Sequence, residues 1–116
     1  LEDYGIFANA LTCGGKGILT PESIGEMRTP RLSPALPAVS RGFNWGLLVR
    51  YCAHSSRFQL LPPGCWGWSG AFGTHFFIDP ARKACAVLFS NSFAARGSDS
   101  ITCRDLERCY VDALTD

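Results

Sequence analysis

The sequence predicts an α+β domain in which helices pack on an antiparallel sheet. Three observations indicate this class: helical spacing of apolar residues near both ends of the chain, apolar runs of strand length between residues 43 and 90, and turn residues that separate those runs. A chain of 116 residues has room for one domain, 1–116, with a modest core.

The first forty residues predict two helices and a loop. Apolar side chains recur at helical spacing at Tyr4, Phe7, Ala8 and Leu11. The glycines at 14–15 can adopt the left-handed conformation that ends a helix. Thr20 is then an N-cap and Pro21 the first residue of a short helix that reaches Met27. The prolines within 30–40 predict a loop without regular structure.

The middle of the chain predicts strands. Residues 43–51 alternate in the period of one half-buried strand. Residues 65–78 indicate two short strands or one long strand, because three glycines interrupt them. Asp79 and Pro80 indicate a turn, and the continuous apolar run 84–90 is typical of a central strand buried on both faces.

The end of the chain predicts a helix that begins with an N-cap at 98–100. One face carries the residues expected to pack inward, Leu106, Cys109, Tyr110, Ala113 and Leu114. The opposite face carries the charged residues expected in solvent, Arg104, Asp105, Glu107 and Arg108.

Charge and hydropathy exclude two classes of partner. Eleven basic and ten acidic residues give a net charge of +1, and neither sign forms a block, which argues against nucleic acid and anionic lipid. No apolar run approaches the roughly 20 residues of a membrane span. The N-terminal residues show no secretion signal. The chain begins at Leu1 without an initiator Met, which indicates a fragment or a processed chain.

The six cysteines indicate neither a zinc site nor a disulfide framework. No Cys-x-x-Cys pair occurs, and we expect no metal and no cofactor. Scattered spacing favours reduced structural thiols, and these slightly favour a cytoplasmic location that is otherwise unknown. Whether Cys52 and Cys65 pair is left open by the sequence.

Residues 66–75 combine small and aromatic side chains. Small residues can leave backbone N–H groups within reach of a substrate, and they can equally allow a glycine-rich strand to bend against tryptophans. Ser69 does not lie in a Gly-x-Ser-x-Gly elbow. We expect His75 to be a hydrogen-bonded strand residue and His54 a solvated loop residue, because no spacing supports a catalytic triad.

Four segments occur in a recognisable order: two helices around a glycine turn at 3–27, a strand at 43–47, a glycine-rich hairpin at 68–80 and a return strand at 87–91. Together they resemble the C-terminal portion of the serine β-lactamase-like family, which includes class C β-lactamases, D-alanyl-D-alanine carboxypeptidases and β-lactamase-type esterases. The resemblance implies the C-terminal part of the β-lactamase/transpeptidase-like fold.

The third active-site motif of that family is Lys-Thr-Gly, His-x-Gly or Trp-x-Gly, and the similar residues here are Trp68, Ser69 and Gly70. The resemblance implies that these three residues contact the substrate and that the backbone N–H of Ala71 is one oxyanion-hole donor. A tryptophan where β-lactamases carry a cation favours neutral esters over substrates with a carboxylate.

Two motifs of the family are missing from this sequence. Neither Lys16 nor Lys83 follows a serine by three residues, so the nucleophile motif Ser-x-x-Lys is absent, and so is Tyr-x-Asn. We therefore expect a C-terminal fragment of a penicillin-recognising serine hydrolase that is inactive alone. Its partner would be the missing N-terminal catalytic portion, and its substrate a small ester, β-lactam or peptide.

Two further hypotheses stay open at this point. The chain is a non-catalytic module that binds a peptide or subunit along a strand edge at 66–75, or it is a truncated product without a function of its own. In the fragment hypothesis, the chain alone should expose a sheet edge or its apolar central strand.

Overall fold

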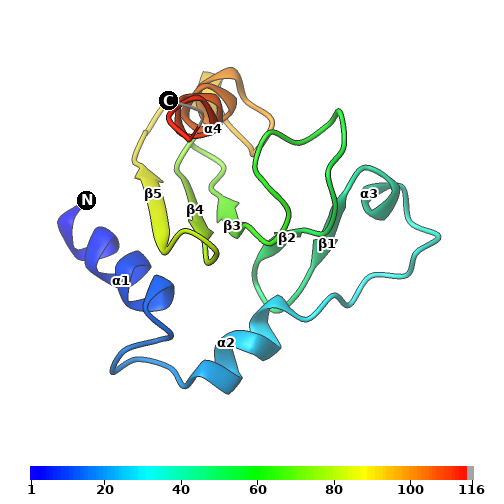
Figure 1. Ribbon diagram of the computed structural model, residues 1–116. Coiled ribbons are helices and arrows are strands. Elements are labelled where there is room, and N and C mark those ends of the chain that lie inside the picture. The colour runs from blue at the N-terminus through cyan, green and yellow to red at the C-terminus, as the bar shows by residue number, and fades with distance from the viewer. Residues whose placement is uncertain (115–116) are drawn as a thin grey trace.

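The computed structural model describes residues 1–114 and contains one antiparallel sheet whose strands lie in chain order. The strands are β1 (Phe43–Trp45), β2 (Arg50–Cys52), β3 (Trp66–Ser69), β4 (His75–Asp79) and β5 (Ala84–Leu88). Figure 1 shows the sheet running from β1, which contacts α3, to β5, which contacts α1. The predicted α+β class, with helices packed on an antiparallel sheet, is confirmed.

Helices lie on both faces of this sheet. Their bounds are α1 (Glu2–Thr12), α2 (Pro21–Arg28), α3 (Pro37–Ser40) and α4 (Ile101–Asp112), with a short 3-10 turn η1 (Phe93–Ala95) before α4. The residues at 65 and 66, and those at 77 and 78, belong to different hydrophobic clusters because successive strand residues point to opposite faces. Both faces are therefore apolar and both are covered.

The first cluster joins α1 and α2 to the sheet. Its buried residues are Leu11, Ile24, Val49, Trp66 and Ile78. The second cluster lies on the α4 side, and its buried residues are Cys52, Leu61, Cys65 and Phe77. Leu106 and Tyr110 of α4 pack against this second cluster. The apolar area removed from water at these two clusters is the main favourable term that holds the helices to the sheet.

The ends of the first two helices agree with the sequence. Gly14 and Gly15 have φ of 78° and 85°, the left-handed conformation predicted for the end of α1. A Cβ at Gly15 would lie 2.1 Å from the carbonyl oxygen of Leu19, so this position also needs the absence of a side chain. The Thr20 hydroxyl accepts a hydrogen bond from the backbone N–H of Ser23, which confirms the predicted N-cap of α2.

The prediction of one strand over 43–51 is wrong. The segment forms β1, a turn and β2, and these strands pair with each other through the register Trp45 with Arg50. At the turn, Leu48 has φ of 63° and is almost fully exposed. The backbone N–H of Leu47 bonds to the carbonyl of Met27 at 2.9 Å, so contact with α2 determines where the strand is interrupted. The alternation of residues along 43–51 carries no information about this contact with α2.

Two other expectations need correction. The segment 30–40 includes the short helix α3, because Pro37 occupies a first-turn position where its missing N–H costs no hydrogen bond. The apolar run 84–90 is not a central strand among the described residues: β5 lies at the edge of the sheet, and its side chains are only half-buried. An apolar strand at an open edge is what the fragment hypothesis expects.

Six cysteines occur in the described part of the chain, all as free thiols. Cys52, Cys65 and Cys103 are buried, whereas Cys13 and Cys109 are exposed. The exposure of Cys109 contradicts its predicted place on the inward face of the last helix. No helix among residues 1–114 is long and apolar enough to cross a membrane.

Gly67 of β3 lies against the backbone of β4. A Cβ there would lie 2.1 Å from the carbonyl oxygen of Phe76 and 2.7 Å from the Cα of Phe77, both backbone atoms that cannot move aside cheaply. We expect Gly67→Ala to lower the free energy of unfolding by about 1–3 kcal/mol, measured by urea denaturation. The matched control is Gly5→Ala in α1, where nothing lies within 4 Å. That control should raise stability by about 0.5–1 kcal/mol, and equal effects would contradict the close approach.

The buried thiols should be chemically silent in the folded chain. Burial raises the pKa of Cys52 to about 12, while burial followed by the nearby Asp79 carboxylate raises the pKa of Cys65. A thiol reagent at neutral pH should therefore modify the exposed Cys13 and Cys109, while Cys52 and Cys65 react much more slowly until urea unfolds the chain. Peptide mapping by mass spectrometry measures this, and similar rates at Cys52 and Cys13 would contradict it.

Candidate functional site

The turn between β3 and β4 brings the candidate site residues together. Ser69 pairs with His75 as the last residue pair of the two strands, and the chain turns between them. The turn is closed by a hydrogen bond of 2.8 Å from the backbone N–H of Gly70 to the carbonyl of Thr74. Gly73 has φ of 87°, and a Cβ there would lie 2.8 Å from the carbonyl oxygen of Ala95, so the turn requires a glycine at this position. A Cβ at Gly70 would lie 2.1 Å from the Thr74 hydroxyl, which would have to move.

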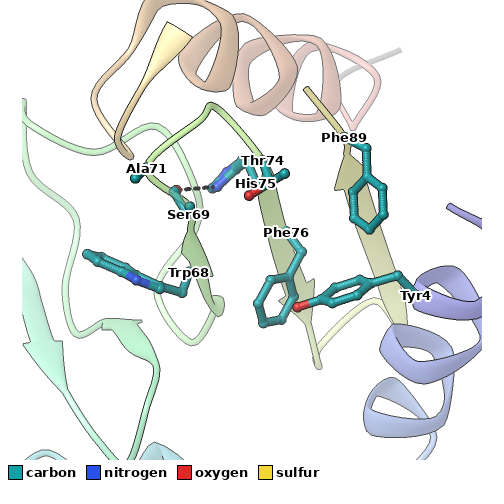
Figure 2. Close-up of a pocket in the computed structure, with 9 residues that line it drawn as sticks. Tyr4, Trp68, Ser69, Ala71, Thr74, His75, Phe76 and Phe89 are labelled. Carbon is teal, nitrogen blue, oxygen red and sulfur yellow. Dashed lines mark hydrogen bonds between the residues drawn. The ribbon is translucent and has the colours of Figure 1, made fainter. Parts of the chain in front are cut away.

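An open cavity of about 450 Å³ lies beside this turn. Figure 2 shows the side chains around it, and the lining residues are Tyr4, Trp68, Ser69, Gly70, Ala71, Thr74, His75, Phe76 and Phe89. All four residues that the sequence singled out, 68–71, therefore lie in the wall of one cavity. Their roles in catalysis or substrate binding stay predictions.

Aromatic rings form the apolar part of the wall. The ring of Tyr4 lies edge-on to Phe76 and to Phe89, with ring centroids 5.4 Å and 5.3 Å apart. The ring of Trp68 packs against Trp45 with centroids 4.2 Å apart and remains 39% exposed. Burial raises the pKa of the Tyr4 hydroxyl, so this group is a neutral phenol at physiological pH. Such a wall accommodates an apolar, uncharged group.

The predicted strand edge at 66–75 is shorter than expected. β3 lies inside the sheet, but β2 pairs only with Trp66 and Gly67, so the pairing with β2 stops before Trp68. Beyond Ser69 the chain leaves the ladder and enters the turn. Within residues 1–114, no backbone hydrogen bond uses the N–H of Ala71, which lies on the exposed part of the turn. The backbone groups that a ligand could reach are thus confined to 68–69 and the turn.

A buried polar group lies behind the cavity wall. The Ser69 hydroxyl is 2.8 Å from Nδ1 of His75, and Figure 2 shows this hydrogen bond between β3 and β4. On the other side of the ring, Nε2 of His75 is 3.2 Å from Oε1 of Glu107 on α4. All three side chains are buried. The expectation of a hydrogen-bonded strand histidine is confirmed, and the expectation of a solvated Glu107 is wrong.

Arg50 of β2 supplies the positive charge beside Glu107. Its guanidinium lies 3.9 Å from the Glu107 carboxylate and 3.8 Å from that of Asp99, and it donates a hydrogen bond of 2.9 Å to the Ser98 hydroxyl. The guanidinium also stacks over the ring of Phe43, 4.3 Å from its centroid. A nearby cation lowers the cost of burying Glu107, which explains how a glutamate can lie on the inner face of α4.

A second carboxylate anchors α4 to the sheet. The buried Asp79 accepts hydrogen bonds from the Tyr110 hydroxyl at 2.8 Å and from the Arg82 guanidinium at 2.9 Å. Burial raises the pKa of Asp79, but these hydrogen bonds outweigh it and hold the pKa below its usual value. The predicted turn role of Asp79 is also confirmed, because the backbone N–H groups of Ala81 and Arg82 donate to it.

Sequence reasoning missed Arg50, His75 and Glu107 as a group. The three residues come from β2, β4 and α4, and the order of the chain does not show that α4 crosses behind the hairpin. One signal was available: a hairpin with its turn at 70–74 places Ser69 opposite His75. The sequence left open whether 65–78 form one strand or two, so the pairing of Ser69 with His75 could not be predicted from it.

Comparison with known protein families identifies the family of this chain. A family model described as Beta-lactamase matches residues 1–106, most of the chain. A search of curated proteins gave no match. Potential metal ligands do not gather into a group of three or more within residues 1–114.

The bond between Tyr110 and Asp79 should affect stability in a pH-dependent way. We expect Tyr110→Phe to lower the free energy of unfolding at pH 7 by about 1.5–3 kcal/mol, because it removes a hydrogen bond to a buried charged acceptor. The folded pKa of Asp79 is lowered, so its stabilisation is complete above the unfolded pKa of about 3.9 and is lost as pH falls through the folded pKa.

The difference between wild type and Tyr110→Phe should therefore shrink in acid, which urea denaturation at pH 7 and pH 3 measures. Tyr51→Phe is the control, because the described structure gives the Tyr51 hydroxyl no hydrogen bond to a carboxylate. A difference that is equal at both pH values would mean that Asp79 is not the group stabilised by Tyr110.

Proposed function

This chain belongs to the β-lactamase family, and we propose that it supplies one side of the acyl-transfer site of a serine hydrolase. The observation that carries the proposal is the placement of Trp68, Ser69, Gly70 and Ala71 in one cavity wall. The Ala71 N–H lies at the exposed turn of this wall, outside every backbone hydrogen bond described for residues 1–114. A backbone donor of this kind can stabilise the oxyanion of a tetrahedral intermediate.

The nucleophile of this site comes from a segment outside these 116 residues. The sequence has no Ser-x-x-Lys and no Tyr-x-Asn, so the groups that activate a serine are not in this chain. The complementary segment supplies the serine, its lysine and the second oxyanion donor, either in the same protein or as a separate chain. The edge strand β5 supports this arrangement, because its outer side has no strand partner among the described residues and Phe89 beyond it is 48% exposed.

The substrate class is a neutral ester rather than a β-lactam or a D-alanyl peptide. Trp68 occupies the position where a cation would attract a substrate carboxylate, and it packs against Trp45 instead. The remaining walls carry Tyr4, Phe76 and Phe89, which offer apolar contact. None of the described residues that line this cavity is a lysine or an arginine. Arg50, whose guanidinium lies 6.0 Å from the centroid of the Trp68 ring, is held by acidic residues and Ser98.

A second function, binding without turnover, uses the same surface. The backbone that is not fully paired, at 68–69 and in the turn, is too short to hold an extended peptide along a strand. A binding module would therefore use the cavity, and it would bind the same ligands without hydrolysing them. The experiment below separates the two functions.

We expect activity when the chain is combined with a β-lactamase-family segment that carries Ser-x-x-Lys and Tyr-x-Asn. Hydrolysis of p-nitrophenyl acetate should rise above that of either piece alone, and hydrolysis of a chromogenic β-lactam should rise less, because Trp68 offers no charge to a carboxylate. A stable complex without any gain in turnover would support the binding module instead. No complex and no gain would overturn the proposal.

The role of Ala71 is tested in the same complex. Ala71→Pro removes the backbone N–H and should lower kcat by about 100–1,000-fold, the cost of losing one oxyanion donor. Ala71→Ser changes the side chain, keeps the N–H, and should retain activity within a few-fold. Thermal denaturation of both variants shows whether the turn still folds. Equal activity of the two folded variants would mean that this N–H does not face the reacting oxygen.

A further inference from the structure

The proton positions around His75 follow from its neighbours. Nε2 of His75 and Oε1 of Glu107 are buried 3.2 Å apart, and neither atom has a hydrogen-bond partner among the described residues. A carboxylate can only accept, so the proton of a neutral imidazole lies on Nε2, where it faces Glu107. Nδ1 then carries a lone pair and accepts the hydrogen of the Ser69 hydroxyl, 2.8 Å away.

Side chains from several elements surround the His75 ring. The side chains in contact with the His75 ring are Ser69 from β3, Phe77 from its own strand β4, and Glu107 from α4. Arg50 from β2 lies beside Glu107, and Asp99 lies on the far side of Arg50. The imidazole with its proton on Nε2 alone is the form in which Ser69 donates to Nδ1.

The Ser69 hydroxyl therefore has its only hydrogen directed inward. What remains for a ligand is an oxygen with lone pairs, which accepts hydrogen bonds and donates none. A ligand carboxylate beside Ser69 would face this acceptor and the uncharged Trp68, and none of the described residues that line the cavity is a lysine or an arginine. A neutral ligand with an N–H or O–H group can instead donate to the Ser69 oxygen.

We propose that His75, with Nε2 beside the Glu107 carboxylate, sets the hydrogen-bond direction of the Ser69 hydroxyl and thereby makes the cavity select neutral, donor-bearing ligands over carboxylates. His75 and Glu107 are positioning residues in this proposal, since they act through Ser69. The proposal rests on the proposed function in one respect, that the cavity beside Ser69 is the ligand site. A proton on both nitrogens would reverse the selection, because Nδ1 would donate to Ser69 and free its hydrogen for a carboxylate.

The proton positions can be measured directly by 15N NMR of the chain labelled at histidine. The chain has two histidines, so His54→Asn assigns the spectrum by removing the exposed ring. We expect His75 at pH 7 to carry its proton on Nε2, with Nδ1 unprotonated. A proton on Nδ1 alone, or on both nitrogens, would overturn the proposal without any ligand or catalytic partner in the experiment.

The role of Glu107 is tested with two substitutions. Glu107→Gln keeps a carbonyl acceptor of the same length and should preserve the Nε2-protonated form. Glu107→Leu removes the acceptor and should give a mixture of the two tautomers. If Glu107→Leu does not fold, the wild-type spectrum and the Glu107→Gln spectrum still decide the matter. An unchanged tautomer in a folded Glu107→Leu chain would mean that Glu107 does not hold His75.

The ligand preference is tested with a matched pair of small probes, phenylacetamide and phenylacetate. They share an apolar ring, but only the amide carries N–H donors and only the acid carries a charge. We expect phenylacetamide to shift the backbone NMR signals of 68–74 with a Kd about tenfold lower, equal to ~1.4 kcal/mol. Ser69→Ala should reduce the difference to about twofold or less, and Ser55→Ala, at an exposed site away from the cavity, should leave it unchanged.

The outcomes separate this inference from the proposed function. Equal or tighter binding of phenylacetate, or no binding of either probe at 68–74, would overturn the ligand preference. Turnover in the combined chains together with a doubly protonated His75 would sink this inference alone. Correct proton positions and probe preference without turnover would leave it standing and overturn the acyl-transfer proposal.

Discussion

The pairing of β3 with β4 is the constraint on which the rest of the structure depends. Its register pairs Trp66 with Ile78, and both side chains pack on the face covered by α1 and α2. The neighbouring residues Cys65 and Phe77 pack on the face covered by α4. The same register ends at Ser69 and His75, where the chain turns. A slip of one residue would exchange the two faces, so core packing and the cavity wall are determined by one set of backbone hydrogen bonds.

Two buried carboxylates attach α4 to this hairpin. Asp79 is bound by Tyr110 from the helix, and Glu107 reaches from the helix to His75 and Arg50. Burying a carboxylate without partners would cost several kcal/mol, so each such group restricts the helix to positions where its partners are in reach. The polar contacts therefore determine where α4 lies, while apolar burial supplies most of the attraction. The wall behind Ser69 is consequently well defined.

Much of the architecture follows from local patterns. The N-cap at Thr20, the glycines that end α1, the turn at Asp79 and the N-cap of α4 at Ser100 were predictable, because each depends on residues a few positions apart. Cavity residues 68–71 were found through resemblance to a family motif. The resemblance also gave the family, because it rests on the order of segments along the chain.

By itself, the sequence determined the α+β class, the helix ends and the segment that lines the cavity, since these depend on short-range spacing and the order of motifs. Only the tertiary structure decided that 43–51 divides against α2, that β5 lies at an edge, and that Glu107 is buried. The physical reason is the same in each case. The pattern along the helix predicts a solvated Glu107, whereas its burial depends on Arg50, which is distant in sequence and places a positive charge beside the carboxylate.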